Sequence, residues 1–422
     1  MPKLLAPPRL RQPDRAQMLI RPCSLEELIA PDHSVRVVWE VVGRWDLAPF
    51  LQHIKARGEA PGRAATNPQL CIALWLYAYT QGVSNGRELE RLCEESGPYR
   101  WLCGGVSVNY HTLNDFRVWH QTALDSLLTQ MIAALTSQGL VKVSRISTDG
   151  TRVRAGAGRN SFKTRDTLQR HLDEARAHVA AMKRQADDPT MGLKKKKAAE
   201  RAARQRTERI EKALSEITKI EAAKEAQKEK PSKHQRAKAS TTDPEARPMR
   251  MPGGGTAPAY NVQFSVATQG RAIVGVDVTN SGSDVHEATP QRQQVELRTE
   301  QKVQEQLVDG GYVGLEAVNE AAAADTTLYA PLPAPKKEGV DPHARKKGDT
   351  DAVAAWRERM GTAQAKEMYK ERASTVETAN AECKTYRGLR QVLVRGIDKV
   401  KCIALWSALA YNLMHFGRAM IA

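Results

Sequence analysis

The stretch Ser144–Ala157 constrains the fold of this chain most, because it has the pattern of a strand yet carries a carboxylate in its middle. Its alternation of apolar residues with small and basic ones favours a β-strand. Asp149 lies near its centre and is followed directly by Gly150. A carboxylate in a buried strand is costly to desolvate unless a partner or a metal ion compensates it. The alternative interpretation is an Asp-Gly turn between two short strands.

Two stretches far downstream contain acids that could be partners of Asp149. Leu307–Gly314 is an apolar strand end that leads into Asp309 and a Gly-Gly turn, and Tyr369–Lys384 is a helical stretch that carries Glu377. Three carboxylates brought together by a fold can bind two divalent cations, which activate water and stabilise a leaving oxygen in phosphoryl transfer. Oxygen ligands with few Cys or His nearby favour Mg²⁺, for which Mn²⁺ can substitute.

The net charge and the spacing of the cysteines limit the classes of protein to which this chain can belong. The chain has 422 residues and a formal net charge of +16. This charge indicates a polyanionic partner, although a basic surface without a partner would give the same value. The six cysteines form no C-x-x-C pair, so we predict neither a zinc site nor a disulfide framework. Apolar runs are too short to span a bilayer and the first residues lack a signal-peptide pattern. We therefore expect a cytoplasmic, nucleoid-associated protein without a membrane partner.

Residues 1–140 are predicted to form an all-helical domain, since helix start signals and apolar residues at helical spacing recur through them. In the segment Asn109–His120, polar side chains surround a helix start and could contact DNA phosphates or base edges. These side chains are Asn109, His111, Thr112, Asn114 and Arg117. The other interpretation is helix capping and a solvated face. Arg117 is kept as a predicted DNA-binding residue.

Residues 163–240 differ sharply in composition from the rest of the chain and contain very few aromatics. Between Met191 and Ser240, sixteen Lys and Arg face seven Glu, which gives a local net charge of +9. Two helical runs, Thr167–Asp187 and Lys194–Lys230, are separated by a break that contains Pro and Gly. We predict a basic helical hairpin inserted into the second domain, 141–422. The alternative is a solvated linker helix or partial disorder.

The order of elements after residue 140 is strand, insertion, strand, strand, helix, strand, helix, strand and helices. The second and third strands are predicted at 260–268 and 272–280, the fourth ends at Asp309, and the fifth lies at 326–332. Three strands in a meander followed by alternating helix and strand is the order of an α/β RNase H-like fold with a mixed five-stranded sheet. There the first and fourth strands are neighbours, so Asp149 and Asp309 should lie side by side.

These motifs resemble those of the DDE insertion-sequence transposases, which have an RNase H-like core and a Y-R-E-K signature helix. ISTDGTRVRA is similar to their first-Asp strand and LVDGGYVG to their second-Asp motif. Tyr369, Arg372, Glu377 and Lys384 fall at the signature positions, although four residues separate Arg from Glu where the general signature has three. The helical N-terminal part is similar to the DNA-binding segment that precedes the core in this group.

The resemblance implies a role for each of these positions. Asp149, Asp309 and Glu377 would be the catalytic residues and the ligands of two metal ions, and Tyr369, Arg372 and Lys384 would bind DNA. At 100° per residue, Tyr369, Glu377 and Lys384 lie within ~80° of one another on one helix face, and Arg372 lies on the flank, ~60° the other way from Tyr369. Glu371 and Glu382 point elsewhere and are poorer candidates for the third acid.

Other residues compete for these roles. Asp277 lies within a strand and Asp284 in the following loop, and neither precedes a Gly-Gly turn as Asp309 does. Tyr312 as the nucleophile of a tyrosine recombinase would require an Arg-His-Arg cluster, which is not visible nearby. His286 is a lone loop histidine, and such residues are more often solvated than bound to a metal.

We therefore expect a transposase that cuts DNA at the ends of its own element and joins these ends to target DNA. Two Mg²⁺ ions would support the chemistry, and cleavage of two ends implies a homodimer on double-stranded DNA. Two alternatives stay open at this stage. One is a catalytically inactive DNA-binding relative, and the other is an RNase H-like nuclease without strand transfer.

Overall fold

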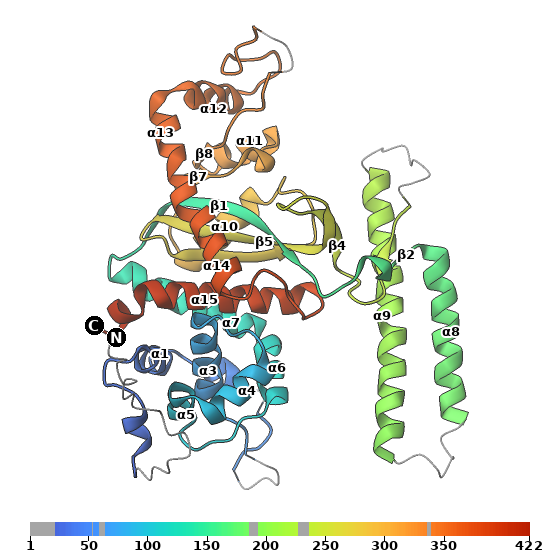
Figure 1. Cartoon of the computed structure of the whole chain (residues 1–422). Helices are drawn as coiled ribbons and strands as arrows, with labels where there is room; N and C mark the ends of the chain where they lie inside the picture. The colour runs from blue at the N-terminus through green and yellow to red at the C-terminus, as the bar shows by residue number, and fades with distance from the viewer. Residues whose placement is uncertain (1–21, 53, 59–63, 185–192, 227–235, 336–338) are drawn as a thin grey trace, which may run out of the picture.

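The structure is a computed structural model that describes residues 22–52, 54–58, 64–184, 193–226, 236–335 and 339–422 (Figure 1). Residues 1–21, the break between the two predicted hairpin helices and the last residues of each of these helices lie outside the described residues. Among the described residues, no helix combines the length and apolar content that crossing a membrane requires.

The N-terminal part is helical, as predicted. Its elements are η1 (Leu25–Leu28), α1 (Ser34–Gly43), α2 (Ala48–Leu51), α3 (Pro68–Thr80), α4 (Gly86–Glu95), α5 (Gly97–Cys103), α6 (Tyr110–Trp119) and α7 (Gln121–Ser137). Asn67 caps α3 by accepting a hydrogen bond from the backbone N–H of Gln69 at 2.8 Å, and Pro68 occupies the first helical position. Helix α3 is buried almost throughout because the long C-terminal helix α15 (Ile397–Ile421) packs against it.

The described residues form a mixed six-stranded sheet that is compatible with an α/β RNase H-like core. Its strands are β1 (Lys142–Arg154), β4 (Arg247–Arg250), β5 (Thr256–Gln269), β6 (Ile273–Thr279), β7 (Glu305–Leu307) and β8 (Thr327–Tyr329). Strand β1 pairs antiparallel with β5 and parallel with β7, which confirms the predicted adjacency of the first and fourth strands. Asp149 pairs with Phe264 in the middle of β1, so the Asp-Gly hairpin interpretation is wrong.

The sixth strand, β4, was not predicted. It holds four residues and pairs with the start of β5, where Pro248 lies opposite Pro258. Proline cannot donate to a ladder, so it argues against a strand in sequence reasoning and is tolerated at sheet edges. The predicted five-stranded sheet is therefore extended by one short edge strand.

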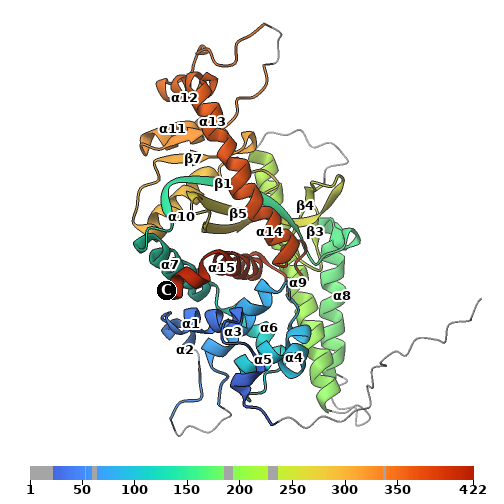
Figure 2. The same ribbon diagram turned by 60° about the vertical axis from the view of Figure 1, so that its left-hand side comes forward.

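Helices cover both faces of the sheet (Figures 1 and 2). They are α10 (Ala288–Thr299), η3 (Gly310–Tyr312), α11 (Leu315–Ala323), α12 (Asp351–Gly361), α13 (Ala363–Arg372), the π-helical turn η4 (Ala373–Glu377) and α14 (Thr378–Tyr386). Helix α13, η4 and α14 follow one another without a break and cross the sheet where η4 packs on β1 and β5. One hydrophobic core joins the N-terminal helices, α15 and one sheet face.

The segment between β1 and β5 holds the helical hairpin. It consists of η2 (Arg159–Ser161), β2 (Phe162–Lys163), α8 (Arg165–Arg184), α9 (Leu193–Ala226) and β3 (Ala239–Ser240). Strands β2 and β3 pair with each other at its base, and α8 and α9 lie side by side (Figure 1). The two helices share a small apolar cluster of their own, which includes Leu168, Leu172, Ile210 and Ile217.

Candidate active site

Asp149 is the most strongly constrained of the predicted acids. Its side chain is only 16% exposed, and its Oδ1 lies 2.9 Å from Nη2 of Arg372. Its Oδ2 accepts a hydrogen bond from Nδ2 of Asn380 at 3.1 Å. Burial above all, together with the charges of Asp309 and Asp284, raises the pKa of Asp149 to about 6 against the opposing effects of Arg372 and Asn380. The fold therefore places a desolvated carboxylate among other acids at the centre of the sheet.

Asp309 follows β7, the strand that pairs with β1, and it is half-buried. Its Oδ1 accepts a hydrogen bond from the backbone N–H of Gly311 at 2.7 Å and so caps the short turn η3. Gly310 and Gly311 thus form a turn that the carboxylate of Asp309 stabilises. Because the charge of Asp309 contributes to the raised pKa of Asp149, the two carboxylates belong to one electrostatic environment.

Arg372 and Glu377 meet across the π turn, which corrects the expected position of Arg372 on the flank. Arg372 is 9% exposed, and its Nη1 lies 2.5 Å from Oε1 of Glu377. The guanidinium therefore bridges Asp149 and Glu377. A π turn spaces its hydrogen-bonded residues five apart rather than four. Residues 372 and 377 consequently fall one turn apart and face the same side.

Tyr369 and Lys384 lie in the same electrostatic environment. Burial raises the pKa of Tyr369, and the charges of Arg372, Asp309, Glu377 and Asp149 also act on it. Burial lowers the pKa of Lys384, against an opposing effect of Asp149. The four residues that the resemblance pointed to thus lie in one electrostatic environment with Asp149. Glu371 and Glu382 point elsewhere, since the former pairs with Arg145 at 3.0 Å and the latter lies 3.8 Å from Arg387.

Arg117 is not part of this group. It lies on α6, where its guanidinium packs over the ring of Trp75 at 4.6 Å and its Nη1 donates to the backbone oxygen of Ser84. Its own backbone oxygen accepts a hydrogen bond from Nε1 of Trp406 at 3.0 Å. These contacts hold α6 against α3 and α15. The side chain of Arg117 therefore supports helix packing, and its contact with DNA stays a prediction.

The competing acids are held by other partners. Asp277 lies 2.9 Å from Nζ of Lys401, and Asp284 is paired with Arg152 at 2.9 Å. Tyr312 is fully buried and donates its hydroxyl to Oε1 of Gln263, so it is not accessible as a nucleophile. His286 lies in an exposed part of the loop.

A buried polar network beside Asp149 was missed in the sequence. Oδ1 of Asp284 accepts hydrogen bonds from the amides of Asn261 at 2.6 Å and Gln263 at 2.8 Å. Gly150 packs directly on these three side chains. The signal was present in the sequence, because Asn261 and Gln263 are two apart and therefore share one face of a strand. Polar residues at these positions favour an exposed face, whereas this face points into the protein.

The donor set is chemically suited to a divalent cation, because all three predicted ligands offer carboxylate oxygens, which Mg²⁺ and Mn²⁺ prefer. The geometry is not that of an assembled metal site. Within the described part of the chain, no group of three or more His, Cys, Asp and Glu side chains is arranged to hold a metal ion. Arg372 lies between Asp149 and Glu377, and the side chain of Glu377 is 50% exposed.

Two family models match the chain. Residues 23–119 match the Transposase domain (DUF772), and residues 336–416 match the Transposase DDE domain. The first match covers η1 to α6, and the second includes α12, α13, η4, α14 and most of α15. Neither the curated proteins nor the solved structures contain a significant match. Together, the two domain matches support an insertion-sequence DDE transposase, a DNA-cleaving enzyme that uses divalent metal.

Proposed function

We propose that this protein binds the ends of an insertion sequence, cleaves the DNA there and joins the freed ends to target DNA. The observation that carries the proposal is the position of Asp149. This acid is buried at the centre of a mixed sheet, and the strand that precedes Asp309 pairs with its own strand. The helix that carries Glu377 crosses directly over it. A raised carboxylate pKa in such a setting is typical of a functional site.

Asp149, Asp309 and Glu377 are the proposed ligands of two divalent metals, Mg²⁺ or Mn²⁺. When bound, the metals would supply Lewis-acid stabilisation of the attacking and leaving oxygens in phosphoryl transfer. The protein itself fixes the positions of the charged side chains at the site. Asn380 and Arg372 orient the Asp149 carboxylate through its two oxygens. The cations Arg372 and Lys384, both largely desolvated, would hold DNA phosphates next to these acids.

Tyr369 is proposed to contact the DNA end. It is half-buried on the same helix, two turns before Glu377, and packs against a further apolar cluster beside β7 and β8, which includes Leu307 and Leu328. The apolar cluster therefore holds the ring in place, and an aromatic ring on which a base stacks needs such packing. Transposition requires cleavage at both ends of the element, so we propose that two copies of the protein act together on DNA as a homodimer.

The test is strand cleavage and strand transfer by purified protein on a duplex that carries an element end, with Mg²⁺ or Mn²⁺. We expect Asp149→Asn, Asp309→Asn and Glu377→Gln each to abolish cleavage while DNA affinity changes little. Asp277→Asn is the matched control, because Asp277 is an acid of the same sheet that pairs with Lys401 instead. If Asp277→Asn abolishes cleavage and Asp309→Asn does not, the assignment of the second acid is wrong.

The same assay distinguishes the alternatives. Joined product supports a transposase, cleavage without joined product supports a nuclease, and binding without cleavage supports an inactive relative. Light scattering of the protein with and without the end duplex checks the homodimer, which should form or persist on DNA.

A further inference from the structure

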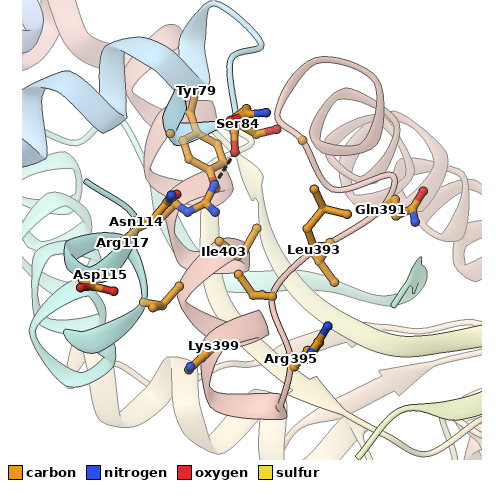
Figure 3. Close-up of a pocket in the computed structure, with 16 residues that line it drawn as sticks. Tyr79, Ser84, Asn114, Asp115, Arg117, Gln391, Leu393, Arg395, Lys399 and Ile403 are labelled. Carbon is orange, nitrogen blue, oxygen red and sulfur yellow. Dashed lines mark hydrogen bonds between the residues drawn. The ribbon is translucent and has the colours of Figure 1, made fainter. Parts of the chain in front are cut away.

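A cavity of about 630 Å³ lies between the N-terminal helices and the C-terminal part of the chain (Figure 3). One wall comes from α6 and the turn before α4, with Asn114 and Ser84. The opposite wall is the loop 388–395, which includes Gln391 and Leu393. The start of α15 closes one end with Lys399. Segments from three regions of the sequence thus meet around it.

This cavity is connected to the candidate active site by a single strand. The loop that forms its wall pairs with the end of β1, where Arg154 bridges to Gln391 and the backbone N–H of Val392 donates to the oxygen of Arg154 at 2.9 Å. Asp149 lies five residues earlier on the same strand. At about 3.4 Å per residue, the cavity wall begins roughly 17 Å from that acid.

Cations without acidic partners lie at the end of the cavity. Arg395 and Lys399 are both exposed there (Figure 3). Neither forms a salt bridge with any described residue. The acid on the lining is Asp115, which is exposed. Asp243, whose pKa responds to Arg395, is buried and accepts hydrogen bonds from the hydroxyl of Tyr260 and the backbone N–H of Gly396.

The helical hairpin adds further positive charge at the same place. Nζ of Lys212 lies 2.9 Å from Oε2 of Glu245, and the same oxygen accepts a hydrogen bond from the backbone N–H of Ile397 at 3.3 Å. Helix α9 therefore lies beside the start of α15. Arg209 is one turn before Lys212 on this helix and is half-buried, and burial together with the charges of Arg395 and Arg206 lowers its pKa.

Like charges gathered in this way repel one another, and none of these four cations forms a salt bridge with an acid among the described residues. We define the basic cleft as the cavity lined by Arg395 and Lys399, together with Arg206 and Arg209 on the neighbouring helix α9. An extended anion that contacts several of them would remove the repulsion. The lining suits a sugar-phosphate backbone, because the amides of Asn114 and Gln391 can donate to phosphate oxygens. The exposed apolar side chain of Leu393 can contact deoxyribose faces.

We propose that the basic cleft binds the phosphate backbone of duplex DNA and leads it toward Asp149. This inference rests on the proposed function and adds a location to it. The hairpin helix α9, the loop 388–395 and the start of α15 would hold one duplex together, so the hairpin contributes to DNA binding through Arg206 and Arg209.

The test compares two triple variants that remove the same charge. The cleft variant carries Arg209→Gln, Arg395→Gln and Lys399→Gln. The control variant carries Lys142→Gln, Arg271→Gln and Lys366→Gln, which are exposed cations elsewhere; the first two lie at the opposite end of β1 and β5. The probe is a fluorescent duplex of random sequence without divalent metal, and its affinity is measured by anisotropy over a series of KCl concentrations.

Each lost phosphate contact reduces the slope of log affinity against log salt by about 0.9. We expect the cleft variant to have a slope shallower by about 2.7 and the control variant to have the slope of the parent. A third variant, Arg209→Lys with Arg395→Lys, keeps the charge and should restore the parental slope, which excludes misfolding as the cause.

The outcomes separate this inference from the proposed function. If the parent binds the duplex with a steep salt dependence and the cleft variant behaves like the parent, the basic cleft does not hold DNA and the inference is overturned. If the parent does not bind duplex DNA at all, the proposed function itself fails. If both triple variants lose slope equally, the binding surface is diffuse and the basic cleft has no special role.

Discussion

Replacing Gly150 by alanine tests whether the buried network beside Asp149 holds the central strand in place. A Cβ atom at this position would lie 2.6 Å from Nε2 of Gln263 and 2.7 Å from Oδ1 of Asn261, and it would overlap Oδ1 of Asp284. Asn261 and Gln263 are fully buried, and the Asp284 carboxylate holds both amides. None of the three side chains can move away without losing a hydrogen bond.

The magnitude follows from two contributions. Overpacking a buried site costs about 1–3 kcal/mol. Loss of one hydrogen bond to the charged Asp284 carboxylate costs about 1.5–3 kcal/mol. We therefore expect Gly150→Ala to lower the free energy of unfolding by about 2.5–6 kcal/mol. Because the substitution lies next to Asp149 in β1, DNA cleavage should fall together with stability.

Urea denaturation followed by circular dichroism measures this change. Gly158→Ala is the matched control, because a Cβ atom there meets no heavy atom within 4 Å and the backbone φ of −87° suits alanine. The control should stay within about 0.5 kcal/mol of the parent. If Gly150→Ala is as stable as Gly158→Ala, the network is not tightly packed and the reasoning is refuted.

Three further predictions concern other parts of the same arrangement. Tyr312→Phe should lower the free energy of unfolding by about 1–3 kcal/mol, since it leaves the buried Oε1 of Gln263 without its donor. Arg372→Lys should lower the cleavage rate by on the order of tenfold or more, because an ammonium cannot replace the planar fork that bridges two carboxylates. Burial opposes ionisation of Glu216, but its pairing with Lys219 and Arg247 outweighs this and lowers its pKa below 4.5. The ion pair between Glu216 on α9 and Arg247 on β4, which attaches the hairpin to the sheet, should therefore be intact above pH 4.5. It should weaken as the pH falls through the lowered pKa of Glu216, and faster amide exchange in α9 would report this.

Each of these predictions has an outcome that contradicts it. Unchanged unfolding of Tyr312→Phe would mean that water replaces the lost donor. A parental cleavage rate in Arg372→Lys would show that charge alone matters at this position. For the hairpin, Glu216→Gln should exchange quickly even at neutral pH, and slow exchange in that variant would remove the ion pair as its anchor.

Five of the six strands of the sheet were predictable because strand patterns are local, and only the short edge strand β4 was missed. Alternation in Ser144–Ala157, the two strands before the loop with Asp284, and the strand end at Asp309 all lie where the residues indicated. The hairpin helices were also predictable, since long runs of Ala, Lys, Arg and Glu favour helix on their own. The observed starts at Arg165 and Leu193 lie within two residues of the predicted ones.

What could not be predicted depends on partners distant in the sequence. Helix α15 is among the helices expected after the fifth strand, but only the structure shows that it packs between the N-terminal helices and β6. The contact of Arg117 with Trp75 could not be predicted either, because nothing nearby in the sequence indicated Trp75 as its partner. Asn261 and Gln263 were taken as ordinary strand residues, since their carboxylate partner, Asp284, follows after another complete strand.

The position of Arg372 could have been predicted from a departure in spacing that the sequence already contained. Four residues separate Arg372 from Glu377, one more than in the general signature, and in a regular α-helix the two would point ~140° apart. A π turn takes up one additional residue, and η4 occupies Ala373–Glu377, directly between them. Residues before the π turn keep the α-helical angle to Tyr369 in α13. Residues after the turn keep the α-helical angle to Asn380 in α14. The turn therefore sets the rotation between the two halves, so that Arg372 from one half and Asn380 from the other both contact Asp149. The extra residue in this helix is thus best interpreted as a π turn that restores a shared face.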